Sequence, residues 1–158
     1  MIDLIQRYKN KGILVDTNIL LLAVVGAVNR SRISKFKRTE QFTPEDYDLL
    51  IGILDNFSKV VTTPNIMTEV NSFLNQIGEP DRHKCILMLA DFTNKLNEFY
   101  IESKEAAKFN NFGKLGLTDC GIINLAKDKY LVLTVDATLQ NFLYSENVDV
   151  VNFNHIRF

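Results

Sequence analysis

The sequence has few of the residues that build disulfide or histidine–metal scaffolds. Its 158 residues include two cysteines, Cys85 and Cys120, and two histidines, His83 and His155. The histidines are far apart and in no ligand spacing, so we expect both at the surface. Because acidic and basic residues interrupt segment 1–10, it does not resemble an export signal. We therefore expect a cytoplasmic protein with free thiols rather than a disulfide.

The chain also lacks a large net charge and a long hydrophobic run. Its formal net charge is −1, so any affinity for nucleic acid must come from a local patch or a metal ion. The apolar stretch 19–28 is far too short to span a membrane, and we expect no membrane association. No repeat, low-complexity tract or Pro-, Gly- or Ser-rich linker divides the sequence, and 46% of its residues are hydrophobic. These features predict a single domain over residues 1–158.

Short apolar runs alternate with helical patterns along the chain. The runs predict buried strands at 13–15, 60–61, 99–101, 131–135 and 148–151. Helices are predicted at 2–9, 18–28, 43–56, 63–76, 81–97, 118–127 and 137–145, and loops at 29–41 and 110–116. Two of the helices begin with Thr-Pro, an N-cap followed by proline at the first helical position. The alternation indicates an α/β fold with a central parallel sheet and helices on both faces.

Four acidic residues stand at positions that acids usually avoid. Asp16 follows the apolar run 13–15 and Asp136 follows 131–135, so both lie at the carboxyl ends of predicted parallel strands. Open α/β sheets bind their ligands there. Asp119 lies on the buried face of a first helical turn, and Glu69 borders the apolar stripe of another helix. Since burial costs a carboxylate its hydration, we interpret the four acids as a shared divalent metal site.

Each acid also has a purely structural interpretation. Asp16 and Asp136 are suited to N-cap the helices that follow them, and Asp119 would complement a helix dipole. Glu69 would then be a solvated helix residue. The order and the context of the four acids together favour the metal site.

The segments around these acids resemble the four motifs of the PIN-domain nucleases, and in particular the toxin-type single-domain ribonucleases. The Val-Asp-Thr-Asn segment 15–18 looks like the first motif, and Glu69 within 63–70 looks like the second. Segment 117–119 looks like the third, and segment 133–136, followed by Leu139, looks like the fourth. The resemblance implies a three-layer α/β/α domain and cleavage of RNA with Mg²⁺ or Mn²⁺. It also implies a possible toxin role, with an antitoxin protein as partner.

Within this resemblance the acids receive roles. Asp16, Asp119 and Asp136 are expected to hold the ion directly or through water. Glu69 is the fourth acid of the metal site and is expected to position the attacking water. Carboxylate oxygens suit hard cations, and such an ion activates water and stabilises charge on a phosphate.

Several neighbours of the acids are candidates to orient the carboxylates or a phosphate. They are Asn18, Thr118 and Thr134. Helix capping and hydrogen bonds at strand ends explain these residues equally well. Cys120 stands where the family usually has a small residue, and we expect it to pack rather than act as a nucleophile.

A basic segment within 29–41 is a candidate RNA contact. It contains Arg30, Arg32, Lys35, Lys37 and Arg38, with Phe36 available to stack on a base. An ordinary solvated connector explains the same charges. The segment lies near the acids only if the preceding helix turns back. The apolar faces of helices 45–56 and 64–76 are candidates for a homodimer or inhibitor-protein surface, although most such stripes belong to a core.

Two other functions fit parts of the pattern. An aspartyl-phosphate phosphatase also has a strand ending in Asp, but it needs a second Asp two residues later, where this chain has Asn18. A non-catalytic RNA-binding or scaffold module could use the same fold. The presence of all four acids favours a metal-dependent endoribonuclease over both.

Overall fold

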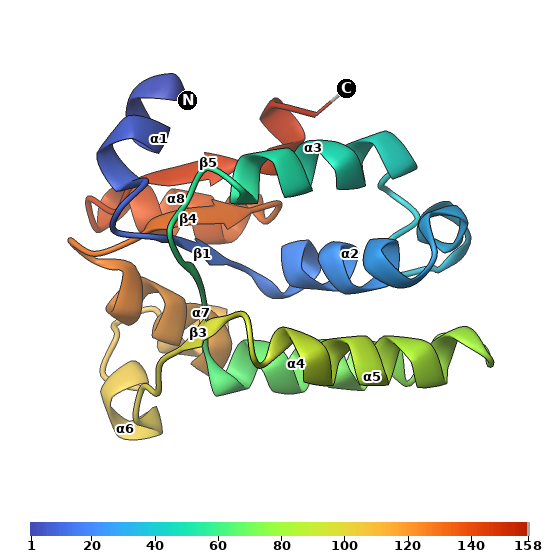
Figure 1. Ribbon diagram of the computed structural model, residues 1–158. Helices are drawn as coiled ribbons and strands as arrows, with labels where there is room; N and C mark the ends of the chain where they lie inside the picture. Colours follow the sequence, from blue (N-terminus) through green and yellow to red (C-terminus); the bar gives the residue numbers. More distant parts are fainter. Residues whose placement is uncertain (158) are drawn as a thin grey trace.

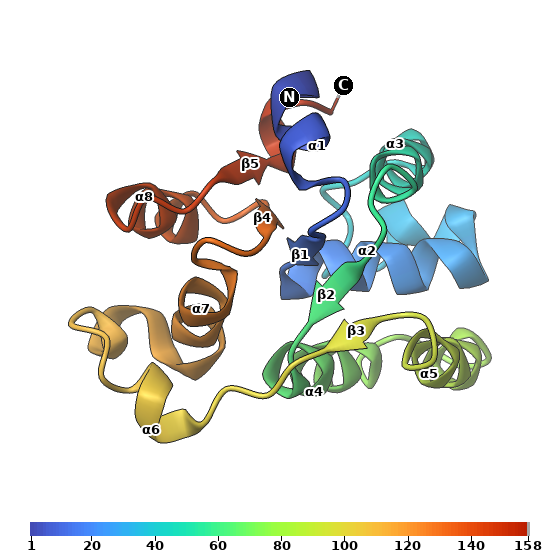
Figure 2. The same ribbon diagram turned by 60° about the vertical axis from the view of Figure 1, so that its left-hand side comes forward.

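A computed structural model describes residues 1–157 of the chain (Figures 1 and 2). The strands are β1 (Ile13–Val15), β2 (Val60–Thr62), β3 (Asn97–Glu98), β4 (Leu131–Thr134) and β5 (Val150–Asn152). The α-helices are α1 (Ile2–Tyr8), α2 (Thr17–Val28), α3 (Pro44–Leu54), α4 (Pro64–Leu74), α5 (Asp81–Phe92), α6 (Ser103–Ala106), α7 (Phe112–Ala126) and α8 (Ala137–Ser145). Two 3-10 helices, η1 (Arg30–Lys35) and η2 (Phe153–His155), complete the described elements.

All five strands are parallel and form one sheet in the order β3-β2-β1-β4-β5. The chain builds outward from β1 to β3 and then crosses over to add β4 and β5 on the other side of β1. The strand order therefore reverses between β1 and β4, where Val15 pairs with Leu133. Ligands of open parallel sheets bind in the crevice at such a reversal point.

Helices cover both faces of the sheet, which confirms the predicted α/β class. Figure 2 shows α7 and α8 on one side of the sheet and α1 and α3 on the other. Helix α2 continues from the end of β1 and packs against α3, α4 and α5 (Figure 1). Because α2 is surrounded in this way, its residues 19–26 are buried, as its apolar composition predicts.

The structure corrects the predicted elements at several positions. Helix α5 ends at Phe92 rather than residue 97, and the next strand is Asn97–Glu98 rather than 99–101. Segment 29–41 contains the 3-10 helix η1, and the short helix α6 was not predicted. Elements of two to six residues are too short to leave a periodic apolar pattern.

Helix α7 begins earlier than predicted and is kinked. Residues 112–115, expected in a loop, form a first helical part, and Gly116 interrupts the helix with φ 81° and ψ −176°. That positive φ favours glycine because a β-carbon is strained there. The kink places Lys114 in the first part of α7 and Thr118 and Asp119 in the second.

The remaining predictions about cysteines, histidines and membranes can be compared directly with the structure. Cys85 and Cys120 are free thiols and both are buried, and His83 and His155 are exposed. Burial raises the pKa of Cys85 to about 11 and also raises the pKa of Cys120, which argues against a reactive thiolate. Among the described residues, no helix combines the length and apolar character needed to cross a membrane.

Candidate active site

The four candidate acids gather where the strand order reverses. Asp16 follows β1, Asp136 follows β4, Glu69 lies on α4 and Asp119 on the second part of α7. They are close enough for their charges to interact, because the charges of the other three raise the pKa of Asp119. The fold therefore brings together residues that are separated by up to 120 positions along the chain.

Asp16 is the most tightly held of the four. Its side chain N-caps α2 by accepting a hydrogen bond from the Ile19 N–H on Oδ1 at 2.9 Å. Its Oδ2 accepts hydrogen bonds from the Thr134 hydroxyl and from the Val135 N–H, the latter at 3.2 Å. Asp16 is 5% exposed, and burial raises its pKa to about 6 although these three donors oppose the rise. These donors hold the carboxylate between the ends of the neighbouring strands β1 and β4.

Asp136 is exposed and N-caps α8. Its Oδ1 accepts hydrogen bonds from the N–H groups of Thr138 at 2.7 Å and Leu139 at 3.0 Å. The capping interpretation of Asp16 and Asp136 is therefore confirmed. A carboxylate has two oxygens, however, and Oδ2 of Asp136 makes no hydrogen bond among residues 1–157. Capping and metal binding are compatible at this residue.

Glu69 is half-buried and held by two hydroxyl groups. Oε1 accepts a hydrogen bond from Thr17 at 3.3 Å, and Oε2 accepts one from Thr118. Glu69 is thus not a freely solvated helix residue. The predicted capping role of Thr118 is wrong, because the helix begins before Thr118 and the kink at Gly116 turns its hydroxyl toward Glu69.

Asp119 is half-buried and makes no hydrogen bond among the described residues. Burial raises its pKa to about 7, with further contributions from the charges of Asp136, Asp16 and Glu69. A carboxylate in this position is poorly stabilised by the protein alone, because neither a donor nor a cation offsets its lost hydration.

None of the four acids forms an ion pair within residues 1–157. All nine salt bridges of the described residues involve other acids. Among residues 1–157, no group of three or more His, Cys, Asp or Glu side chains is arranged to hold a metal ion. The donors nevertheless fit Mg²⁺ or Mn²⁺, since Mg²⁺ prefers oxygen ligands, keeps several waters and uses one or two carboxylates directly.

The threonines around the acids connect the site. The Thr134 hydroxyl, besides donating to Asp16, accepts a hydrogen bond from the Asp136 N–H at 2.9 Å, so it links the two strand-end acids. Asn18 is half-buried and forms no hydrogen bond with any of the four acids. Sequence reasoning missed Thr17 as the residue that holds Glu69. Its place within the Val-Asp-Thr-Asn segment was the available signal.

The basic segment lies away from the acids. Helix α2 has 12 residues and does not turn back, so its two ends are separated by about 18 Å at 1.5 Å per residue. Asp16 precedes one end of α2, and the segment begins at the other end with Asn29. The RNA-contact hypothesis for this segment stays a prediction.

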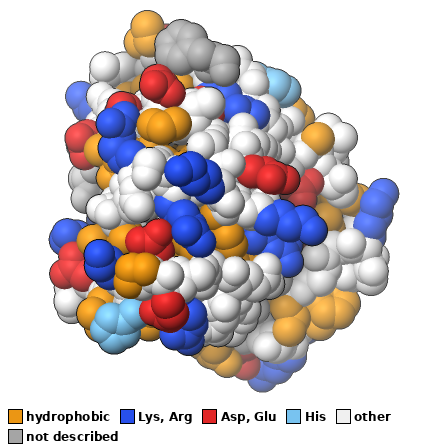
Figure 3. Space-filling model, turned by 90° about the vertical axis from the view of Figure 1, so that its right-hand side faces the viewer, with side chains coloured by type: hydrophobic (Ala, Val, Ile, Leu, Met, Phe, Trp, Pro, Cys, Tyr) orange, Lys and Arg blue, Asp and Glu red, His pale blue; other side chains and the backbone are white. Residues whose placement is uncertain are grey.

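The side chains of this segment largely contact the protein itself. Arg30 pairs with Asp48, Arg32 lies 3.7 Å from Asp81, and the Arg38 guanidinium stacks 4.3 Å from the Phe73 ring centroid. Phe36 is only 4% exposed, so the expectation that it can stack on a base is wrong. Its ring belongs to the core beside α2. At this end of the molecule, Lys and Arg side chains lie among Asp and Glu rather than in one continuous patch (Figure 3).

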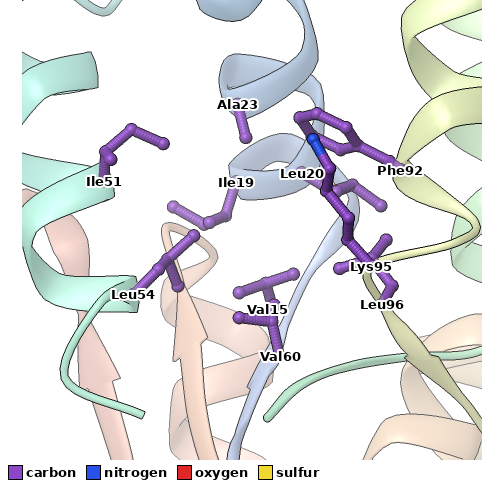
Figure 4. A pocket seen from close by; sticks show the side chains of 10 residues that line it. All are labelled: Val15, Ile19, Leu20, Ala23, Ile51, Leu54, Val60, Phe92, Lys95 and Leu96. Atoms are coloured by element: carbon purple, nitrogen blue, oxygen red, sulfur yellow. The ribbon is translucent and has the colours of Figure 1, made fainter. Parts of the chain in front are cut away.

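An apolar cavity lies near the end of β1, the strand that Asp16 follows. It has a volume of about 130 Å³ and lies between α3, α2 and the end of α5 (Figure 4). Val15 and Ile19, on either side of Asp16 in the sequence, form part of its wall. Lys95 is its one charged lining residue, and none of the four acids reaches it. The cavity is therefore separate from the four acids.

Comparisons with known proteins add no functional assignment to this geometry. No protein-family model matches the chain, and a search of curated proteins finds no match either. The functional interpretation depends on the arrangement of the acids.

Proposed function

We propose that this protein is a divalent-metal-dependent ribonuclease that hydrolyses phosphodiester bonds at the four acids, in the manner of the PIN-domain nucleases. One observation carries the proposal: at the reversal point of a parallel sheet, the charges of three carboxylates act on a fourth, and none of the four has a basic partner among the described residues. Such a concentration of negative charge is stable when a cation or protons neutralise it. The position of the acids is also where open α/β sheets bind ligands.

The chain's own residues have distinct roles in this proposal. Asp119 and the free oxygen of Asp136 would hold the ion, with Asp16 contributing directly or through water. Thr134 keeps Asp16 in place, and Thr17 and Thr118 keep Glu69 aimed at the water that attacks phosphorus. Hydrolysis adds hydroxide from that water to phosphorus, breaks one phosphorus–oxygen ester bond and leaves a proton on the departing oxygen. The bound ion supplies a more acidic water and stabilises negative charge on the phosphate.

The test is cleavage of end-labelled structured and unstructured RNAs in Mn²⁺, Mg²⁺ or EDTA, with Asp16→Asn assayed beside the wild type. Cleavage that needs metal and disappears in the variant is the expected result. A matched control is Asp48→Asn, which removes one exposed acid outside the site. A DNA oligonucleotide of the same sequence tests whether the ribose 2′-hydroxyl matters.

Failure to cleave any RNA would overturn the proposal in favour of a non-catalytic RNA-binding module. Calorimetric titration with Mn²⁺ then separates a metal-dependent binding module from a protein without a metal site. Hydrolysis of a small phosphomonoester that requires Asp16 would instead support the phosphatase alternative, against which Asn18 argues because an amide cannot transfer a proton. A toxin role, an antitoxin partner and a homodimer stay predictions from the sequence.

A further inference from the structure

A second cleft begins beside Asp136 and differs in character from the acid site. It has a volume of about 250 Å³ and lies between the first part of α7 and helix α8. Its lining residues are Lys114, Thr138, Asn141, Phe142 and Ser145. No acidic side chain lines it, although Asp136 accepts the backbone N–H of its lining residue Thr138.

The cleft follows one face of α8. Positions 138, 141, 142 and 145 are spaced by three and four residues, so they lie in one stripe along the helix. The stripe starts two residues after Asp136, whose carboxylate accepts the Thr138 N–H at 2.7 Å. A chain that enters the cleft at this end therefore comes directly from the candidate active site.

The polar groups of the cleft are available to a ligand. Thr138 and Asn141 are exposed, and their side chains make no hydrogen bond among residues 1–157. Lys114 is exposed too, and its ammonium group lies 5.5 Å from the Phe142 ring centroid. No carboxylate of the described residues pairs with Lys114, whereas the exposed Lys104 and Lys108 each pair with a glutamate.

We infer that this cleft holds the sugar-phosphate backbone of a single-stranded nucleic acid next to the bond that the acids cleave, with Lys114 contacting one of its phosphates. The inference rests on the proposed function, and it identifies the cleft along which the bound substrate extends beyond the four acids. Lysine, threonine and asparagine are residue types that commonly donate hydrogen bonds to phosphates. A cleft of about 250 Å³ has room for a sugar and a phosphate but not for a duplex.

Charge complementarity supports this occupant over others. Without a metal ion the four acids repel a polyanion, so the backbone must find a positive charge just outside them. Lys114 supplies that charge from the first part of α7, and the kink at Gly116 separates it from Asp119 on the second part. In this arrangement one phosphate lies at the acids and its neighbour lies at Lys114.

The experiment compares Lys114→Ala, Lys114→Arg and the control Lys104→Ala, which loses the same charge from α6. For each folded variant, kcat and KM for a single-stranded RNA are measured in Mn²⁺ at several salt concentrations. Lys114→Ala should raise KM about 5- to 10-fold with little change in kcat, because it removes a binding contact to a phosphate that does not react. The slope of log(kcat/KM) against log[salt] should become shallower by about 0.7, the contribution of one phosphate contact on a single strand.

The possible outcomes separate this inference from the proposed function. Lys114→Arg should restore KM and the salt slope, and Lys104→Ala should match the wild type. A wild type that cleaves RNA while Lys114→Ala keeps the wild-type KM and slope would overturn the inference alone. A loss that Lys104→Ala shares, or that Lys114→Arg does not reverse, would also overturn it. No cleavage by the wild type would overturn the proposed function and the inference with it.

Discussion

Two pairs of buried or half-buried acids in this protein differ in whether a basic residue offsets their charge. Asp46, 1% exposed, accepts hydrogen bonds on Oδ2 from the Thr43 N–H at 2.9 Å and from Arg157 at 3.1 Å. Asp81, 9% exposed, lies 3.7 Å from Arg32. Asp16 and Asp119 are buried or half-buried as well, but neither has a basic partner within the described residues.

The difference separates acids whose charge is paired within the fold from acids whose charge is not. At Asp46 and Asp81 an arginine compensates for lost hydration, so the carboxylates anchor segments far apart in the sequence. At the acid site, burial raises the pKa of Asp16 and Asp119, and the charges of neighbouring acids raise both further. The charged carboxylates therefore lower the stability of the folded protein. Functional sites commonly carry such a cost in stability.

The largest effect that would test this comparison is on activity. Asp119→Asn should reduce RNA cleavage at least about 100-fold, because it removes a negative oxygen from the ion and the developing charge. The variant should remain folded. The measurement is the cleavage rate in Mn²⁺, with thermal unfolding as a check of folding. Wild-type activity in Asp119→Asn would contradict the assignment of this site.

The next effect concerns the arginine-paired acids. Asp46→Asn should lower the free energy of unfolding by about 3 kcal/mol, because it leaves Arg157 without its charged partner in a mostly buried contact. Urea unfolding measures the loss. At temperatures where the variant is folded, its cleavage rate should stay near that of the wild type. A stable but inactive Asp46→Asn would remove the distinction between the two kinds of acid.

A smaller effect is the pH dependence of stability without metal. The pKa of Asp119 is about 7 in the folded protein against an ordinary value of 3.8, so between these values the folded state binds more protons than the unfolded state. Stability should therefore fall as pH rises from about 4 to about 7, by about 1–2 kcal/mol after solvent screening. Asp16 acts in the same direction up to about pH 6.

The measurement is urea unfolding in EDTA at pH 4.5, 6 and 8, with Asp119→Asn as the comparison. The variant should lose less stability over this range and should be more stable than the wild type at pH 8, since it lacks the repelled charge. Parallel pH profiles for the two proteins would show that Asp119 is not destabilised by its surroundings.

The smallest effect tests the support of Glu69. Thr118→Val removes one of the two hydroxyl groups that hold this carboxylate and should lower kcat about 5- to 10-fold, the equivalent of one hydrogen bond of about 1 kcal/mol. Thr68→Val is the matched control, because Thr68 precedes Glu69 on α4 and is exposed. Equal kcat values for the two variants would mean that the Thr118 hydroxyl does not position Glu69.

Much of the fold could be predicted from local patterns, and the misses have a common cause. The apolar run predicted a strand at 131–135, and β4 is Leu131–Thr134, while α8 has the predicted bounds. The two-residue strand β3 was displaced and α6 was missed. These short edge elements are held by contacts with neighbouring segments, such as the bond from the Phe99 N–H to the Thr62 carbonyl at 3.0 Å. Sequence periodicity does not record such contacts.

The candidate site divides in the same way. Asp16 and Asp136 could be found because an acid directly after a buried strand is conspicuous in a sequence. The role of Thr17 could not be found in this way, because it depends on Glu69 in another helix. The surroundings of Lys114 could not be found either, because they depend on Phe142 in another helix. Phe36 was misjudged for the same reason: its ring belongs to the tertiary core, which its basic neighbours in the sequence do not indicate.

By itself the sequence determined the α/β alternation, the buried strands and the identity of the four acids, because hydrophobic periodicity and strand-end polarity are local properties. Only the tertiary structure decided that β1 and β4 are neighbours. It also decided that the charges of the four acids interact and that no basic residue among those described pairs with them. It also decided that the basic segment lies at the far end of α2. These outcomes depend on which distant segments pack together, and that packing depends on the whole hydrophobic core.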